Sequence, residues 1–285
     1  MIQPTNIHFL AAKDGSEGCS WQLLGLPYDA ASSYRRGAKA GPAEIRRASD
    51  SIETYSPYCQ KDLEDLHFCD AGDLELSDDS PDEAVQEIRR YYAEQASRGM
   101  RHFGLGGDHT VTIGAVQGLV DAGVKPLVLY LDAHLDLREE YDGSRYSHAC
   151  VARRISEMVR PERVVQWGMR SGERAEFEWA RQHVTYQGRD VLTLQKTWRR
   201  LQKEPVYLTL DLDLFDPAEL PGVGNPEPGG LKFSGFLGLL QQLRQLELDI
   251  VAADVVELAP NWDPSGRSAV MAAEVIRELL LTLVK

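Results

Sequence analysis

The chain has 285 residues, of which 43% are hydrophobic, so it can bury a sizeable core. Its formal net charge of −13 argues against nucleic acid or an anionic membrane as a partner, because both attract clustered Lys and Arg. The four cysteines form no Cys-x-x-Cys pair, which argues against a zinc ribbon. No apolar run approaches the roughly 20 residues that span a bilayer, and no signal peptide is visible, so we expect a cytoplasmic protein.

Short apolar segments alternate along the chain with segments of helical pattern. Strands are predicted at 21–26, 66–69, 101–105, 127–131, 163–167, 206–210 and 250–256, with a weaker candidate at 183–186. Helices are predicted at 42–49, 81–97, 110–120, 151–158, 173–182, 190–202, 234–246 and 265–281. The alternation predicts an α/β fold with a mainly parallel sheet covered on both faces. No repeat or linker divides the sequence, so we expect one domain over residues 1–285.

Acidic and imidazole side chains follow four of the predicted strands. In chain order these residues are His109, then Asp132, His134 and Asp136, then Asp211 and Asp213, and finally Glu257. Side chains alternate along a strand, so residues 132, 134 and 136 point the same way if the extended geometry continues. Ligands of parallel α/β sheets bind beyond the carboxyl ends of the strands, so we expect one site there.

The six residues from His109 to Asp213 supply four carboxylates and two imidazoles. Oxygen and nitrogen ligands without a thiolate favour a divalent ion such as manganese over a structural zinc. Six ligands exceed what one catalytic ion takes, so two ions that share bridging carboxylates fit better. A lone acid at a strand end is usually a cap or turn residue, but that explanation does not readily account for two such clusters beside a Gly-Gly-Asp-His turn.

Three segments of the chain resemble the signatures of the ureohydrolase family, which includes arginases and agmatinases. They are Gly106-Gly107-Asp108-His109, Asp132-Ala133-His134-Leu135-Asp136 and Asp211-Leu212-Asp213-Leu214-Phe215-Asp216-Pro217. The resemblance runs from about residue 25 to the C-terminus and implies an arginase-like, three-layer α/β/α domain with two Mn²⁺ per subunit. It implies that His109 and Asp136 bind one ion, that His134 and Asp213 bind the other, and that Asp132 and Asp211 bridge both.

The reaction that this resemblance implies is hydrolysis of a guanidinium group to urea and an amine by a hydroxide that bridges the metals. Guanidinium is a poor electrophile, so the water must be strongly activated. Asp136 would orient the hydroxide, and His148 would shuttle a proton to the leaving amine. Glu257 resembles the acid of the family that binds the guanidinium, which a carboxylate can hold through two parallel N–H bonds. These three residues are the catalytic candidates, and His148 and Glu257 would contact the substrate.

The loop after Asp136, residues 137–147, lacks the Asn-Thr and Ser-Gly-Asn patterns of arginases and is rich in acids. It therefore predicts a small cationic guanidino substrate. This loop and the segments 167–174 and 221–230 resemble the agmatinase branch, which implies hydrolysis of agmatine to putrescine and urea in polyamine biosynthesis. Aminopropylagmatine suits the same acids, while Arg138 and Arg145 leave guanidinobutyrate open. Arginine is a further alternative.

Two other classes of protein compete with a ureohydrolase. A deacetylase-like amidohydrolase usually binds one zinc and shows a His-His pattern that is absent here. A non-catalytic polyamine-binding protein would not require the complete set of ligands. Cys150 has no apparent catalytic partner, so we expect a buried, inert thiol. Ureohydrolases commonly form trimers or hexamers, and the resemblance therefore implies a homo-oligomer.

Overall fold

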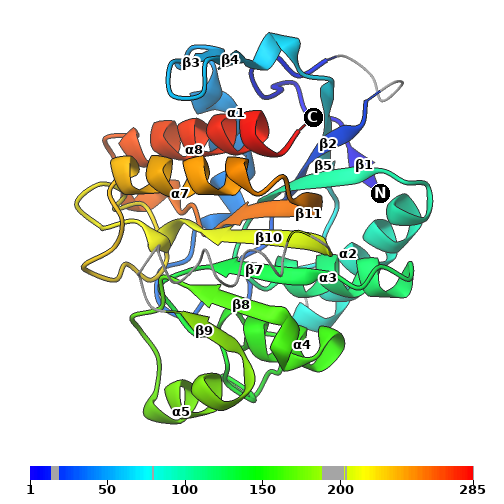
Figure 1. The fold of residues 1–285 in the computed structure, drawn as a ribbon, viewed down its shortest axis with the longest axis vertical. Helices are drawn as coiled ribbons and strands as arrows, with labels where there is room; N and C mark the ends of the chain where they lie inside the picture. The colour runs from blue at the N-terminus through cyan, green and yellow to red at the C-terminus, as the bar shows by residue number, and fades with distance from the viewer. Residues whose placement is uncertain (14–18, 79, 188–201, 203, 285) are drawn as a thin grey trace.

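The computed structural model describes residues 1–13, 19–78, 80–187, 202 and 204–284. Its main sheet has nine strands: β1 (Ile2–Gln3), β2 (Trp21–Leu26), β5 (Phe68–Leu74), β6 (Arg101–Gly106), β7 (Leu127–Leu131), β8 (Val164–Trp167), β9 (Thr185–Gln187), β10 (Pro205–Asp211) and β11 (Asp249–Val256). Their spatial order is β1-β5-β2-β6-β11-β10-β7-β8-β9 (Figure 1). Each neighbouring pair is parallel except β1 and β5.

Helices cover both faces of this sheet, which confirms the three-layer α/β/α fold. They are α1 (Gly41–Ser49), α2 (Pro81–Ser97), α3 (Val111–Asp121), α4 (Val151–Val159), α5 (Arg174–His183), α7 (Phe233–Gln245) and α8 (Arg267–Leu283). Helices α1, α7 and α8 form one group, and α2, α3 and α4 form another group on the opposite face (Figure 1). The helix predicted at 190–202 lies outside the described residues, apart from Gln202.

Short elements complete the described chain. A hairpin joins β3 (Tyr55–Ser56) to β4 (Lys61–Asp62). Single turns of 3₁₀-helix are η1 (Ala38–Ala40), η2 (Leu63–Asp65), η3 (His148–Cys150), η4 (Pro161–Arg163), η5 (Leu212–Leu214) and η6 (Pro260–Trp262). The sequence did not predict β1, β3 or β4, because strands of two residues are too short to show an alternating pattern.

Strand β5 runs five residues beyond its predicted end at Cys69. The extension contains Asp70 and Asp73, which usually disfavour a strand. Buried Arg46 compensates for both acids, with Nε 2.8 Å from Asp70 Oδ2 and Nη1 2.6 Å from Asp73 Oδ1. A tertiary ion pair therefore overrides the local preference for a turn.

The central strands are buried from end to end, as their apolar sequences predict. In β7, Leu129 packs towards α1, α7 and α8, while Val128 and Tyr130 pack towards α2, α3 and α4. Burying one large apolar side chain stabilises the fold by about 1.5–3 kcal/mol. The four strands that carry acidic or imidazole residues at or just beyond their carboxyl ends, β6, β11, β10 and β7, lie next to one another at the centre of the sheet.

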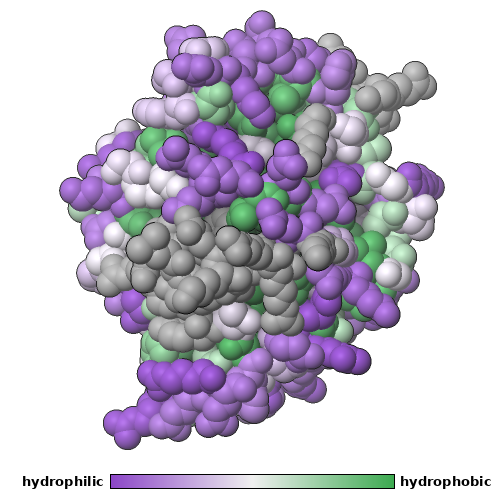
Figure 2. Space-filling model, in the orientation of Figure 1, coloured by the Kyte–Doolittle hydropathy of each residue, from purple (hydrophilic) through white to green (hydrophobic). Residues whose placement is uncertain are grey.

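The surface of the molecule is mostly polar. Figure 2 shows hydrophilic side chains over much of the visible face, with hydrophobic ones in scattered patches. Among the described residues, no helix has the length and apolar character needed to cross a bilayer.

Candidate metal centre

The carboxyl ends of four neighbouring strands bring the predicted site residues together. His109 follows β6, Asp132 follows β7, Asp211 ends β10, and Glu257 follows β11. Two groups of ligand atoms each lie within 4.8 Å of one another: His109, Asp132 and Asp211 form the first, and Asp132, His134 and Asp213 form the second. Asp132 belongs to both groups, so the structure places it between them.

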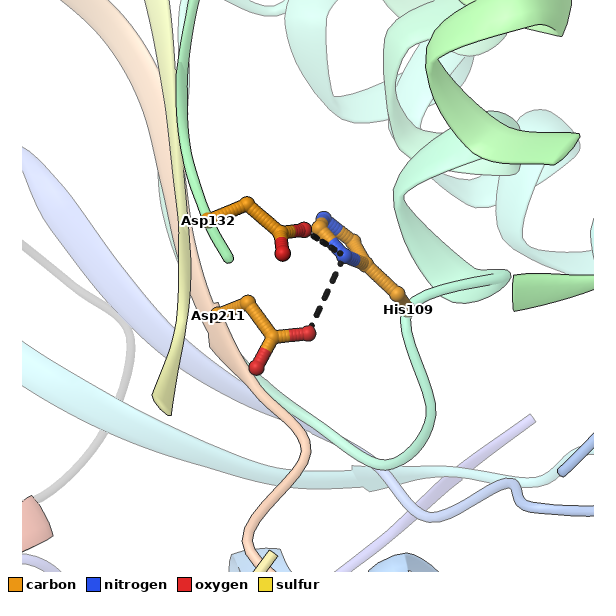
Figure 3. Close-up of side chains that lie close together, drawn as sticks. All are labelled: His109, Asp132 and Asp211. Atoms are coloured by element: carbon orange, nitrogen blue, oxygen red, sulfur yellow. Dashed lines mark ion pairs between the residues drawn. The ribbon is translucent and has the colours of Figure 1, made fainter. Parts of the chain in front are cut away.

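The first group is enclosed by protein. Nδ1 of His109 lies 3.1 Å from Asp132 Oδ2 and 3.3 Å from Asp211 Oδ2, and both carboxylates point at the imidazole (Figure 3). Asp136 Oδ2 lies 3.5 Å from the same nitrogen. Tyr130 stacks on the His109 ring with centroids 4.8 Å apart, and its hydroxyl donates a 2.7 Å hydrogen bond to Asp136. Five side chains from three strand ends thus meet around one point.

The second group faces the pocket. Nδ1 of His134 lies 2.7 Å from Asp213 Oδ2 and 3.7 Å from Asp132 Oδ1, and the imidazole is 24% exposed. Backbone amides hold the acids: the N–H of His134 donates to Asp132, that of Asp213 to Asp211, and that of Ala133 to Asp213. The carboxylates are therefore oriented by the chain itself.

The electrostatics show an excess of negative charge. Burial, followed by the charge of Asp213, raises the pKa of Asp132 and of Asp211 well above the usual range. Burial would lower the pKa of His109, but Asp211 outweighs it and raises that pKa to about 9. Asp213 likewise outweighs burial and raises the pKa of His134 to about 10. A bound cation would relieve the repulsion among these buried acids.

The donor set fits divalent cations. Among the described residues, Asp132 Oδ2 finds no hydrogen-bond partner although it is buried, and a buried carboxylate oxygen left in this way is unfavourable. Carboxylate and imidazole ligands without a thiolate suit borderline-hard ions. The six predicted ligands are thus brought together by the fold, and they leave a position for positive charge.

The backbone at two of the site residues is strained. Asp136 has a φ of 51° and Glu257 a φ of 71°, in the left-handed region that non-glycine residues rarely adopt. The surrounding chain holds both: the Asp136 carbonyl accepts from the N–H of Arg153, and the Glu257 N–H donates to the Gly107 carbonyl. Such conformations cost about 1–3 kcal/mol each and cluster at functional sites.

Glu257 lines the pocket and is 8% exposed. Its Oε1 accepts a 2.7 Å hydrogen bond from the backbone N–H of His109. Its Oε2 points towards Gly224, where an added Cβ would lie only 3.0 Å away. Burial, followed by the charge of Asp108, raises the pKa of Glu257 to about 8. One carboxylate oxygen is therefore held by the chain, while the other faces a glycine.

His148 lines the same pocket, at the start of η3. Its Nδ1 lies 2.7 Å from the carbonyl oxygen of Ala31, which can only accept, so Nδ1 carries the proton. Its Nε2 lies 3.1 Å from the hydroxyl of Ser33. The hydrogen bond to Ala31 leaves Nε2 as the nitrogen that can accept or release a proton.

The pocket has a volume of about 330 Å³ and a rim that the sequence did not predict. Its rim includes Glu173 and Glu176 at the start of α5, together with Ser33 and Asn225. Glu173 caps α5 and Glu176 completes the capping box, while Glu176 also accepts the N–H of Leu137. The Glu-x-x-Glu spacing at the predicted helix start was the available signal, and it indicates only a capped helix.

The acids of the loop 137–147 are placed differently from the expectation. Glu139, Glu140 and Asp142 are absent from the lining of the pocket, and Glu139 pairs with Arg153 and Arg154. The acids of the pocket rim come from α5 instead, because the loop turns its acids outward.

Of the two arginines in this loop, only Arg138 lines the pocket. Its guanidinium lies 3.2 Å from Glu173 and 3.8 Å from Glu176 and stacks over Tyr141, with 4.8 Å to the ring centroid. Arg145 pairs with Glu157 on the surface. Cys150 is buried, and burial raises the pKa of its thiol to about 11, as expected of an inert thiol.

The comparisons with known proteins agree with this geometry. The model of the arginase family matches residues 20–282. The chain is 36% identical to an agmatinase of Bacillus subtilis (97% of this chain, 96% of the relative) and 35% identical to an N(1)-aminopropylagmatine ureohydrolase of Thermococcus kodakarensis (87% and 86%). The solved structure of agmatine ureohydrolase from Thermoplasma volcanium superposes with a TM-score of 0.86 at 32% identity, covering 98% of this chain and 94% of that one. The chain therefore belongs to the arginase family, as its three signatures predict.

Proposed function

We propose that this protein is a manganese-dependent ureohydrolase that converts agmatine to putrescine and urea. The observation that carries the proposal is that two His/Asp groups share the buried Asp132 beside a pocket that His109, His134 and Glu257 line. Membership of the arginase family supports hydrolysis of a C–N bond. Relatives that are agmatinases support the choice of substrate.

Six residues would hold two divalent ions. His109 and Asp136 would bind one ion, His134 and Asp213 the other, and Asp132 and Asp211 both. Two ions of charge +2 would balance the charge of the four carboxylates, of which Asp132 and Asp211 have raised pKa values through burial and the charge of Asp213. When bound, such a pair lowers the pKa of a water molecule towards neutrality and so supplies the nucleophile.

The chain's own residues orient the guanidinium. Glu257 would accept N–H bonds from the substrate through Oε2, since Oε1 already accepts the N–H of His109. The charged form of the carboxylate is required, because only that form has no proton to direct at a cationic donor. Asp136, which Tyr130 holds by a hydrogen bond, would fix the position of the attacking oxygen.

His148 would handle the proton that the leaving amine needs. Its Nδ1–H is held by the Ala31 carbonyl, so Nε2 is the exchanging atom. That nitrogen lies beside Ser33 in the pocket and can pass a proton to the departing amine. The tautomer is thus set before substrate arrives.

The rim favours a substrate with a distal amine over one with a distal acid. Guanidinobutyrate would need an unpaired cation, but Arg138 is already matched by Glu173 and Glu176. An ammonium at the far end of agmatine would meet this net negative rim favourably. Aminopropylagmatine is the second candidate, because it carries a further ammonium and because a relative at 35% identity acts on it.

Urea release from a panel of guanidines tests the proposal. The purified chain, loaded with Mn²⁺, should release urea from agmatine faster than from aminopropylagmatine, guanidinobutyrate, arginine or guanidine. A chelator should abolish the activity, and returning Mn²⁺ should restore it. Metal analysis should find close to two ions per chain. A loaded protein that binds agmatine without releasing urea would point to a binding protein instead.

The proposal also covers the domain organisation, the cellular role and the oligomeric state. Residues 1–285 would form one ureohydrolase domain, working in the cytoplasm in polyamine biosynthesis. The domain would assemble as a homo-oligomer, a trimer or a hexamer, which light scattering on the purified protein measures directly. A monodisperse monomer at assay concentration would contradict the assembly but leave the chemistry standing.

A further inference from the structure

A buried polar chain lies behind the first metal-ligand group, on the side of His109 that faces away from the carboxylates. The Nδ1 of His109 faces Asp132 and Asp211, so its other nitrogen, Nε2, points into the protein. There it lies 2.9 Å from the hydroxyl of Thr209 on β10. Thr209 is fully buried, so the imidazole has one specific partner on that side.

Thr209 in turn lies beside a carboxylate that the proposed reaction does not use. The parallel register of β10 and β11 pairs Thr209 directly with Asp254, which is 0% exposed. Asp254 Oδ2 accepts hydrogen bonds from Tyr207 at 2.6 Å and from Thr112 at 2.7 Å. Within the described part of the chain, Oδ1 makes no complete hydrogen bond. Asp254 is fully buried and absent from the lining of the pocket, so it does not contact a substrate there.

Burying the Asp254 carboxylate without an ion-pair partner costs free energy of folding. Burial raises the pKa of Asp254, and the charge of His109 and the hydroxyls of Thr209, Tyr207 and Thr112 lower it in part. Among the described residues, no Lys or Arg forms an ion pair with it. An apolar residue at 254 would avoid this cost, so the acid calls for a role beyond packing.

We propose that Asp254, acting through Thr209, is a positioning residue that fixes the tautomer and orientation of His109 for metal binding. In this arrangement the Thr209 hydroxyl would turn its proton towards the neighbouring Asp254, whose Oδ1 has no complete hydrogen bond, and its oxygen would accept the Nε2–H of His109. The proton is then kept on Nε2, and the Nδ1 lone pair is free to face the metal. Partners of this kind typically change metal affinity by about 10–100-fold.

The inference rests on the proposed metal centre, and the second ligand group supplies an internal reference. His134 is 24% exposed and is held by Asp213 rather than by a buried chain through Thr209. Removing the Thr209 or Asp254 side-chain group should therefore weaken only the metal-binding step that uses His109 and leave the other step unchanged. General loosening of the sheet would weaken both.

Binding of Mn²⁺ to the metal-free protein tests this, with free Mn²⁺ counted by its electron paramagnetic resonance signal. Wild type should show two binding steps. Thr209→Val and Asp254→Asn should each weaken one step by about 10–100-fold, and Thr209→Ser, which keeps the hydroxyl, should restore it. Ser156→Ala is the control, because it removes a buried hydroxyl from α4 that donates to the Ala152 carbonyl and does not contact Asp254. It should retain both steps.

The outcomes separate this inference from the proposed function. A wild type without Mn²⁺ binding overturns both. A wild type with two steps that Thr209→Val leaves unchanged, or that it weakens equally, overturns the positioning role alone. Melting curves of the metal-free variants show whether each one folds. Should Asp254→Asn not fold, the comparison of Thr209→Val with Thr209→Ser decides.

Discussion

The floor and the rim of the pocket are built in different ways. The floor consists of His109, Asp132 and their neighbours at strand ends, where backbone amides hold buried carboxylates in fixed positions. The rim, which includes Arg138 and Glu173, comes from a loop and a helix start, and its ion pairs are partly exposed. Exposed pairs contribute only about 0–1 kcal/mol each. The floor is therefore suited to the chemistry, and the rim to the choice of substrate.

Asp132→Asn should have the largest effect, because this acid belongs to both ligand groups of the floor. Urea release should fall by about a thousandfold or more, since metal centres supply several kcal/mol of transition-state stabilisation. Metal analysis should show fewer than two ions per chain. Asp142→Asn, an exposed acid of the nearby loop, is the control and should behave as wild type. Full activity in Asp132→Asn would show that the shared carboxylate of the floor is not needed for the reaction.

His148→Ala should rank second, with kcat lowered by about 100- to 1000-fold, as expected for loss of a general acid. Metal content should stay at the wild-type level, because His148 lines the pocket but belongs to neither ligand group. His67→Ala is the control for the loss of an imidazole, because His67 is exposed and does not line the pocket. Loss of metal in His148→Ala would place this residue in the floor instead.

Glu257 predicts a pH dependence. Its pKa is raised to about 8, so the side chain is largely protonated at pH 7 and charged at pH 9. Only the charged form should hold the guanidinium, and kcat/KM should therefore rise through pH 8. Glu257→Gln should lose about 10- to 100-fold in kcat/KM, the equivalent of one hydrogen bond to a charged group. A rate that is flat from pH 6.5 to 9.5 would contradict this role.

Arg138→Met should have the smallest effect on agmatine, less than about fivefold in kcat/KM, because the rim pairs are solvated. It should change the selectivity between agmatine and guanidinobutyrate in favour of agmatine, since Glu173 and Glu176 lose their cation. Arg145→Met, whose pair with Glu157 lies outside the pocket, is the matched control. A variant that loses all activity would show that the rim also supports the chemistry.

The same division decides what could be predicted from the sequence. Asp132, His134 and Asp136 alternate in the sequence after an apolar strand, and this pattern was enough to predict the floor. The extended geometry does not continue through the segment, however, because Asp136 has a left-handed φ of 51°. The rim depends on how the loop turns after Asp136. Glu139 is drawn outward by two arginines that lie 14 and 15 residues further along the chain, and no local pattern reveals this.

Strand order was the other feature that the sequence could not supply. Strands β10 and β11 come late in the chain but lie between β6 and β7 in the sheet. That placement brings Asp211 beside His109 and pairs Thr209 with Asp254. The sequence shows that both strands are apolar and end in acids, but their neighbours follow from packing of the whole sheet.

The left-handed backbone at Asp136 and Glu257 has a practical consequence for protein engineering. Glycine adopts this conformation without steric cost, so Asp136→Gly and Glu257→Gly should relieve strain and remove a buried carboxyl group. A search for heat-resistant variants would therefore tend to select against the residues needed for turnover. Such a search needs an activity screen at every round, because otherwise the selected variants will be heat-resistant but inactive.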